Sequence, residues 1–153
     1  MLSLIQDETL PQRTGVRALA NVTFYAGEHP FAEEFGEVQF TARALSGIPV
    51  LQASGAVAER LEAGEAVEAR VDFFPEYTGG DGDWEAICAR VFARDRERET
   101  VLQVLGGISN LEIARCLLRR MGIQENARLA SLSGARRGEL FRQLRAFPVR
   151  IEG

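Results

Sequence analysis

The sequence predicts an α+β fold, in which a small antiparallel β-barrel carries an attached helical lobe. In the first half of the chain, apolar residues alternate with more polar ones, as they do in half-buried strands. Beyond the glycine-rich segment 77–83 they recur at helical spacing, and a last short strand pattern appears at 149–151. This order indicates that a helical lobe is inserted before the final barrel strand.

Three strands are predicted in the first half of the chain. Segment 16–24 places an apolar residue at every second position, and the glycine and proline of 25–30 predict a hairpin turn. A second strand follows over 31–41, where Gly36 indicates a bulge or bend. The third strand, 66–74, alternates in the same way and ends before a proline.

One helix is expected between the second and third strands. Ser46 is the predicted N-cap, and Pro49 fits the first turn because a missing N–H costs nothing there. The stripe expected to face the barrel consists of Val50, Ala53, Val57 and Leu61.

The second half of the chain predicts helices, each with a start or stop signal in the sequence. A turn-rich connector at 77–83 separates them from the strands, so the predicted limits are a barrel lobe at 1–79, a helical lobe at 80–146 and a return strand at 147–153. The helix signals are Asp83 as an N-cap, Gly106-Gly107 as the end of the apolar piece 101–105, Asn110 as an N-cap, Gly122 as a C-cap, Ser133-Gly134 before a helix that begins near Ala135, and Pro148 as a break.

Composition excludes several classes of function. A net charge of -4 argues against a nucleic-acid partner. Lysine is absent, which excludes Schiff-base chemistry and a P-loop lysine. No apolar run approaches the ~20 residues of a membrane span, and residues 1–7 lack a secretory pattern, so a cytoplasmic protein without a membrane partner is expected. Cys88 and Cys116 are predicted to be buried free thiols.

The sequence contains no cofactor fingerprint and no catalytic set. Gly-x-Gly-x-x-Gly is absent, and the glycines of 79–82 lie beside aspartates that would repel a phosphate. The single histidine, His29, looks like a turn residue, and with two distant cysteines it makes no zinc site. We therefore expect no catalytic, cofactor-binding or metal-ligating residue. The pairs Arg119-Arg120 and Arg136-Arg137 are interpreted as helix surface.

The segment 40–51 is the best candidate for a functional site. It joins a strand to a helix through Ser46-Gly47, and the amide groups of such a helix start can face a ligand or a partner domain. An ordinary capped helix is the competing interpretation.

The run Gly36-Glu37-Val38-Gln39-Phe40-Thr41, followed by Leu45-Ser46-Gly47-Ile48-Pro49-Val50-Leu51-Gln52, resembles the insert domain of the aminoacetone-oxidase-like family of FAD-binding flavoproteins. The resemblance implies a β-barrel with a helical bundle that interrupts a Rossmann-type FAD domain of the same polypeptide. The whole protein would be a bacterial FAD-dependent oxidoreductase with NAD(P)H as an expected electron donor. This chain would be inactive alone, bind no cofactor, and cover the flavin as a lid beside a small-molecule substrate.

The resemblance also implies site residues and an arrangement of the chain ends. Thr41, Ser46 and Gly47 match the family motif and become candidate substrate-cleft residues. The chain departs from the motif at Ala42, where the family often has histidine, and at Ala44, where it has glycine. Residues 2–6 and 151–153 would be connectors to the flanking domain, so both ends are expected close together at one end of the barrel.

Two other functions stay open from the sequence. A stand-alone module that binds a ligand or protein would use the barrel edge or the helix start at Ser46, and would need an exposed apolar patch. An independent hydrolase built on His29 and a serine such as Ser54 ranks far behind.

Overall fold

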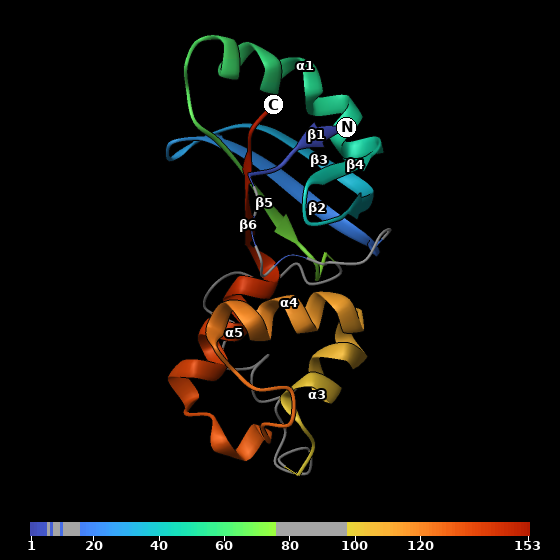
Figure 1. Ribbon diagram of the computed structural model, residues 1–153, viewed down its shortest axis with the longest axis vertical. Coiled ribbons are helices and arrows are strands. Elements are labelled where there is room, and N and C mark those ends of the chain that lie inside the picture. The colour runs from blue at the N-terminus through green and yellow to red at the C-terminus, as the bar shows by residue number, and fades with distance from the viewer. Residues whose placement is uncertain (6, 8–9, 11–15, 76–97) are drawn as a thin grey trace. The chain divides into compact units, whose positions relative to one another are not determined.

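A computed structural model describes residues 1–5, 7, 10, 16–75 and 98–153. Figure 1 shows the elements, which in chain order are β1 (Leu2–Ser3), β2 (Val16–Ala26), β3 (His29–Phe40), β4 (Ala44–Gly47), α1 (Ile48–Glu62), β5 (Val67–Asp72), α3 (Val101–Ile108), α4 (Leu111–Met121), the 3-10 turn η3 (Leu129–Ser131), α5 (Gly134–Arg145) and β6 (Phe147–Ile151).

The chain divides into two compact units. The barrel unit comprises Met1–Pro75 and Arg145–Gly153, and the helical unit comprises Glu76–Leu144. The limit predicted between residues 79 and 80, and the helix predicted from Asp83, lie outside the described residues and stay predictions.

The six strands form one antiparallel sheet in the order β1-β4-β3-β2-β5-β6, which nearly closes into a barrel. Its long members are β2 and β3, a hairpin paired from Val16↔Phe40 to Ala26↔His29. The strand pattern read from the sequence is confirmed here, because the even-numbered residues of β2 from Ala20 to Ala26 are all buried. The fold class is therefore α+β, as the sequence predicts.

Closure of the barrel brings the two ends of the chain together. An isolated antiparallel bridge joins Leu4 to Ile151. Four backbone hydrogen bonds flank it: Ser3 N donates to Gly153 O at 2.7 Å, Glu152 N and Gly153 N donate to Ser3 O at 2.8 and 3.4 Å, and Ile5 N donates to Arg150 O at 2.9 Å. The expectation that both ends lie side by side is confirmed.

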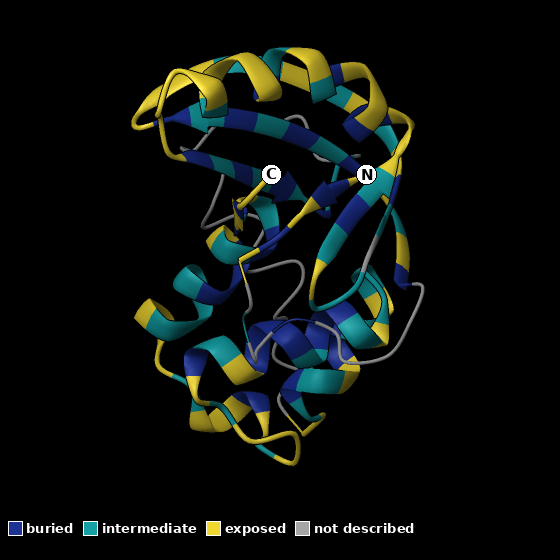
Figure 2. Ribbon diagram, turned by 45° about the horizontal axis from the view of Figure 1, so that its top comes forward, coloured by how far each residue is buried: buried dark blue, intermediate teal, exposed yellow. Residues whose placement is uncertain are grey.

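Helix α1 packs on β3 and also contacts β2, β4 and β5. Its buried face contains Pro49, Val50, Ala53 and Val57, close to the predicted stripe, whereas its opposite face is exposed, as Figure 2 shows. Gly36 gives the proline room, since a Cβ there would lie 3.1 Å from Pro49 Cγ. Of the bulge or bend predicted at Gly36, the bulge is wrong: β2 and β3 pair in register through this residue, and their register shifts between Phe24 and Tyr25 instead.

The helical unit confirms most of its predicted helix signals. Asn110 Oδ1 accepts a hydrogen bond from Ile113 N at 2.8 Å and caps α4, and Gly122 ends the same helix in the left-handed conformation. The predicted end at Gly106-Gly107 is wrong, because α3 runs through both glycines to Ile108. A capping box that Thr100 and Gln103 form starts α3, and Thr100 also lies opposite Arg128 in an isolated bridge.

The two chain ends pair along a line that we call the seam, in which residues 3–5 meet residues 150–153. Its packing predicts how substitutions there change stability. Leu4 is 3% exposed, so Leu4→Ala removes buried apolar surface and leaves a cavity. We expect the free energy of unfolding to fall by about 2–3 kcal/mol. Ile5→Ala, at a neighbouring residue that is 38% exposed, is the matched control and should change it by less than about 0.5 kcal/mol. Urea denaturation followed by circular dichroism measures both, and equal losses would contradict a packed seam.

Candidate functional site

The three residues predicted to line a cleft lie in one corner of the barrel unit, where β3 turns into β4 and β4 continues into α1. Thr41 N donates to Ala44 O at 3.0 Å, and Thr41 Oγ1 accepts from Arg43 N at 3.2 Å, so the hydroxyl holds the turn between the strands. The same turn is tied to the amino-terminal segment, because Leu4 N donates to Arg43 O at 2.8 Å.

Ser46 has a different structural role from the one its sequence position predicts. It lies in β4 opposite Gln39, and its Oγ donates to Gln39 O at 3.2 Å. The predicted N-cap at Ser46 is therefore wrong. Gly47 is the N-cap of α1, and this cap makes no side-chain hydrogen bond.

Gly47 occupies a position that only glycine tolerates. Its φ is 110°, in a region that L side chains rarely adopt, and a Cβ there would lie 2.3 Å from the backbone oxygen of Glu37. This close approach lets Gly47 pair with Val38 while the chain turns from strand into helix. The motif glycine thus fixes the direction in which α1 leaves the sheet.

The exposed side of α1 starts directly at this corner and is apolar. Ile48 is 65% exposed and Leu51 is 69% exposed. They belong to what we call the α1 outer face, the exposed residues Ile48, Leu51, Gln52, Gly55 and Ala58 at helical spacing. Sequence reasoning found the buried stripe of α1 but missed this face. Its signal was available: no charged residue occurs from Ala44 to Ala58.

The corner offers shape and backbone donors rather than reactive groups. Thr41 and Ser46 use their hydroxyls in local hydrogen bonds, and Arg43 is the single charged residue between Thr41 and Ala58. Such a surface can form the wall of a cleft or a docking face, but it supplies no general acid, general base or nucleophile.

The histidine and serine of the hydrolase alternative lie on different elements of the barrel unit, one at the start of a strand and one within a helix. His29 is the exposed first residue of β3, paired with Ala26. Ser54 Oγ donates to Leu51 O at 2.8 Å within α1. No group of three histidine, cysteine or acidic side chains suited to a metal occurs within residues 16–75 and 98–153 or the other described positions. None of the described helices is long and apolar enough to cross a membrane.

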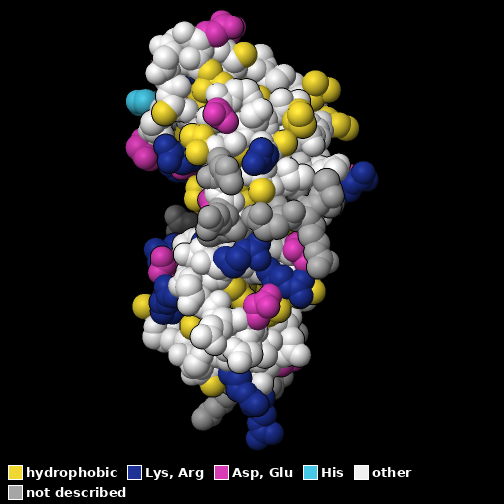
Figure 3. Space-filling view, in the orientation of Figure 1, with side chains coloured by type: hydrophobic (Ala, Val, Ile, Leu, Met, Phe, Trp, Pro, Cys, Tyr) yellow, Lys and Arg dark blue, Asp and Glu magenta, His cyan; other side chains and the backbone are white. Residues whose placement is uncertain are grey.

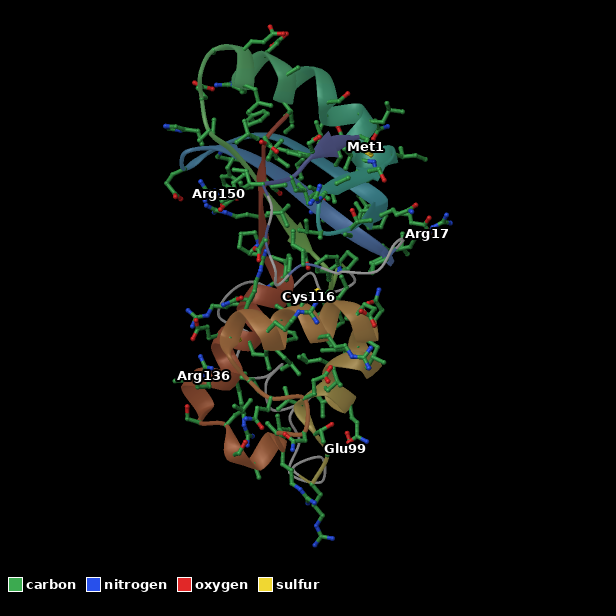
Figure 4. All side chains as sticks on the ribbon, in the orientation of Figure 1. Met1, Arg17, Glu99, Cys116, Arg136 and Arg150 are labelled. Carbon is green, nitrogen blue, oxygen red and sulfur yellow. The ribbon has the colours of Figure 1, made fainter. Side chains whose placement is uncertain are left out.

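In the helical unit, arginines hold helix ends and loops together. Arg136 Nη2 donates to Met121 O at 2.6 Å, at the end of α4, and Arg137 Nη2 donates to Leu129 O at 2.9 Å. Figure 4 shows the Arg136 side chain on this unit. These contacts join α5 to the segments before it and give the second arginine pair a packing role.

A cavity of about 580 Å³ in the same unit is lined by Arg115, Leu118, Arg119, Ile123, Gln124, Glu125 and Asn126. Its Arg115 already pairs with Glu112 at 2.6 Å and with Glu125 at 2.8 Å. Because carboxylates neutralise this guanidinium, it is poorly suited to hold an anion.

Cys116, on α4, is a fully buried free thiol, as predicted for it, whereas Cys88 lies outside the described residues. Burial raises the pKa of the Cys116 thiol to about 11, and nearby Arg119 and Arg120 only partly offset this. At neutral pH the group is therefore a packed thiol and not a nucleophile.

Comparison with known proteins gives two matches. Residues 5–153 match the model of a protein family described as HI0933-like protein barrel and H2TH domain. The chain is also 29% identical over 151 residues to a 3-dehydro-bile acid delta(4,6)-reductase from Clostridium scindens. That alignment covers 97% of this chain and 36% of the reductase, so the chain spans about a third of this relative's length.

The geometry at Gly47 predicts that alanine changes the free energy of unfolding in opposite directions at two nearby glycines. Gly47→Ala should lower the free energy of unfolding by about 2–3 kcal/mol, since it combines a strained φ with a clash against backbone. Gly55→Ala, inside α1 where a Cβ meets nothing within 4 Å, should raise it by about 0.5–1 kcal/mol. Denaturant titration of both variants measures the pair, and a harmless Gly47→Ala would refute the strained corner.

The raised pKa of Cys116 predicts slow alkylation. At pH 8 the thiolate fraction should be about 100-fold lower than for a thiol with a pKa of 9.0, so iodoacetamide should modify native Cys116 at least that much more slowly than in the urea-unfolded chain. Because the folded pKa exceeds the unfolded one, the contribution of this group to stability is complete below pH 9 and is lost as the pH rises toward 11. Peptide mass spectrometry follows Cys116 separately from Cys88, and equal rates in both states would contradict the burial.

Proposed function

The chain belongs to the family of HI0933-like barrel and H2TH domains, and from this premise we propose that it is the insert domain of a FAD-dependent oxidoreductase and forms the substrate-side wall over the flavin. The match confirms the family expected from the motif between Gly36 and Gln52. FAD would be held by a flanking Rossmann-type domain of the same polypeptide, with NAD(P)H as the electron donor. In the whole protein the flavin would supply the redox chemistry.

The observation that carries the proposal is the pairing of the chain ends. Ser3 and Gly153 exchange backbone hydrogen bonds, so the chain enters and leaves the barrel unit at one place. A domain inserted into another needs this arrangement, because the host chain must leave and rejoin its own fold without a long detour. The 36% coverage of the reductase agrees with a piece of a larger protein.

The chemistry of the described residues supports a wall rather than a catalytic domain. The corner at Thr41, Ser46 and Gly47 presents an exposed glycine and an apolar helix face with no reactive group. In the proposed arrangement its task is to exclude water from the flavin and to shape the space in which the substrate binds. Thr41, Ser46 and Gly47 remain our candidates for that cleft, through backbone geometry more than through their hydroxyls.

The proposed partners are argued from the net charge of the chain and from the name of the related reductase. The net charge of -4 gives no support to nucleic-acid binding, and a cytoplasmic flavoprotein without a membrane partner remains our proposal. The related reductase is named for a 3-dehydro bile acid, so we take a 3-dehydro-Δ4,6 bile acid as the first substrate to test. A stand-alone binding module is the alternative, and the exposed Ile48 and Leu51 are the observation in its favour.

The test uses the full-length gene product and a version in which a short Gly/Ser linker replaces residues 4–152. Such a linker suffices because paired strands lie about 5 Å apart. We expect both proteins to bind FAD, measured by absorbance. Iodide should quench the flavin fluorescence more strongly in the linker version, and NAD(P)H-dependent turnover of the bile acid should fall at least about 100-fold.

The outcomes separate the parts of the proposal. A full-length product without flavin would refute the oxidoreductase assignment and favour the binding module. Flavin that iodide quenches equally in both versions would refute the role of this domain as a wall over it. Loss of FAD from a linker version that remains folded would show that the domain belongs to the flavin site itself.

A further inference from the structure

We propose that the α1 outer face is the surface on which the flavin-binding part of the same polypeptide docks. The inference rests on the proposed function and deepens it, because it assigns the contact between the two parts to Ile48, Leu51, Gln52, Gly55 and Ala58. Figure 3 shows hydrophobic side chains gathered around the amino-terminal end of α1 in the barrel unit.

The face has the composition of an interface core. Ile48 and Leu51 are large apolar residues in the first turn of α1, and they are 65% and 69% exposed. The small residues Gly55 and Ala58 continue the exposed face along the helix. Charged residues are depleted in interface cores, and 15 consecutive residues from Ala44 to Ala58 carry none. Charge returns only in the last turn of α1, at Glu59, Arg60 and Glu62, where a solvated surface resumes.

The helix that presents this face is held at both ends. At its start, Pro49 packs against Gly36, and Gly47 fixes the entry of the helix. Near its end, the Arg60 guanidinium lies 5.0 Å from the centre of the Phe31 ring. A docking surface on a preorganised element loses little conformational entropy on binding, which favours a lasting contact.

The position of the amino terminus favours the flavin-binding part as the occupant. The pairing of Leu2 with Leu45 puts Met1, in continuing register, opposite Ser46 and therefore beside the start of α1. Figure 4 shows Met1 at this end of the barrel unit. In the proposed insert, the polypeptide arrives from its flavin-binding part at this point, and Met1, 82% exposed, extends the apolar face toward it.

A second exposed apolar pair on the same unit provides an internal control. Leu19 and Phe35 are 59% and 60% exposed on the outer side of the β2–β3 hairpin. Leu19 lies opposite Glu37, which pairs with Arg17 at 3.9 Å, so these side chains stand among charges. Exposure is nearly equal at both places, but only the α1 outer face is uncharged.

Hydroxyl-radical footprinting of the full-length protein tests the docking. Oxidation rates of Ile48 and Leu51 are compared with those of Leu19 and Phe35, each divided by its rate in the unfolded protein. In this structure the two pairs are almost equally exposed. Docking should protect Ile48 and Leu51 at least about fivefold relative to Leu19 and Phe35, as expected for residues desolvated in an interface core.

A pair of variants supplies a second measurement in the same protein. Leu51→Glu should increase iodide quenching of the bound flavin, because a charge in the contact disfavours docking, whereas Leu19→Glu should leave the quenching unchanged. Flavin absorbance in each variant confirms that the flavin-binding part is still folded.

Each outcome supports or overturns the docking of the α1 outer face. Protection of Ile48 and Leu51 in a flavin-loaded monomer supports the inference. Equal oxidation of the two pairs in a protein that carries flavin overturns it and leaves the proposed function standing. Protection that disappears on dilution from dimer to monomer overturns it in favour of a second copy as the occupant. A full-length protein without flavin overturns both proposals together.

Discussion

Closure of the barrel by the two ends of the chain is the constraint on which the barrel unit depends. β1 has two residues and cannot be stable by itself, yet it is hydrogen-bonded to β4 on one side, while the residues after it meet β6 on the other. Without this seam, β4 and β6 would be the exposed edges of the sheet. Buried Leu4 and Ile151 pack along the same seam, so backbone pairing and apolar burial act at one place. Pairing residues about 150 positions apart carries the entropic cost of closing a long loop, which the hydrogen bonds and apolar burial at the seam offset.

The seam also fixes the position of the corner at Gly47 and of the helix that follows it. β1 holds β4, β4 ends at Gly47, and Gly47 sets the direction of α1, so the α1 outer face is positioned through a continuous chain of backbone contacts from the amino terminus. Little of this arrangement depends on side-chain hydrogen bonds that a substitution readily removes. A host domain attached to the chain ends would therefore be coupled to α1 by rigid elements, which is what a wall over a reaction site requires.

Much of the fold was predictable because its signals are local. Alternation gave the long strands, and Asn110 and Gly122 marked both ends of α4. The short strands β1 and β4 were not predicted, since two and four residues carry no period and exist only through partners elsewhere. Ser46 has the chemistry of a cap, but strand pairing with Gln39 engages its hydroxyl first. For the candidate site, the motif residues Thr41, Ser46 and Gly47 do lie together in one corner, and their role in a cleft stays a prediction. The exposure of Ile48 and Leu51 was missed, although the predicted buried stripe of Val50, Ala53 and Val57 and the uncharged run from Ala44 to Ala58 together leave an apolar side facing away from the sheet.

The distribution of charge explains why recognition through the barrel unit should depend on shape. Between residues 98 and 144 the chain has eight arginines and four glutamates, an excess that suggests an anion partner. Yet Arg136 and Arg137 donate to backbone carbonyls, and Arg115 is held by two carboxylates, so much of this charge stabilises the helical unit itself. The α1 outer face has no charge to attract or to repel. Contact there must come from apolar area and from the fit of small residues such as Gly55 and Ala58, which allow a partner's backbone to approach closely. Such a contact is weakly screened by salt and favours a permanent neighbour over a diffusing one.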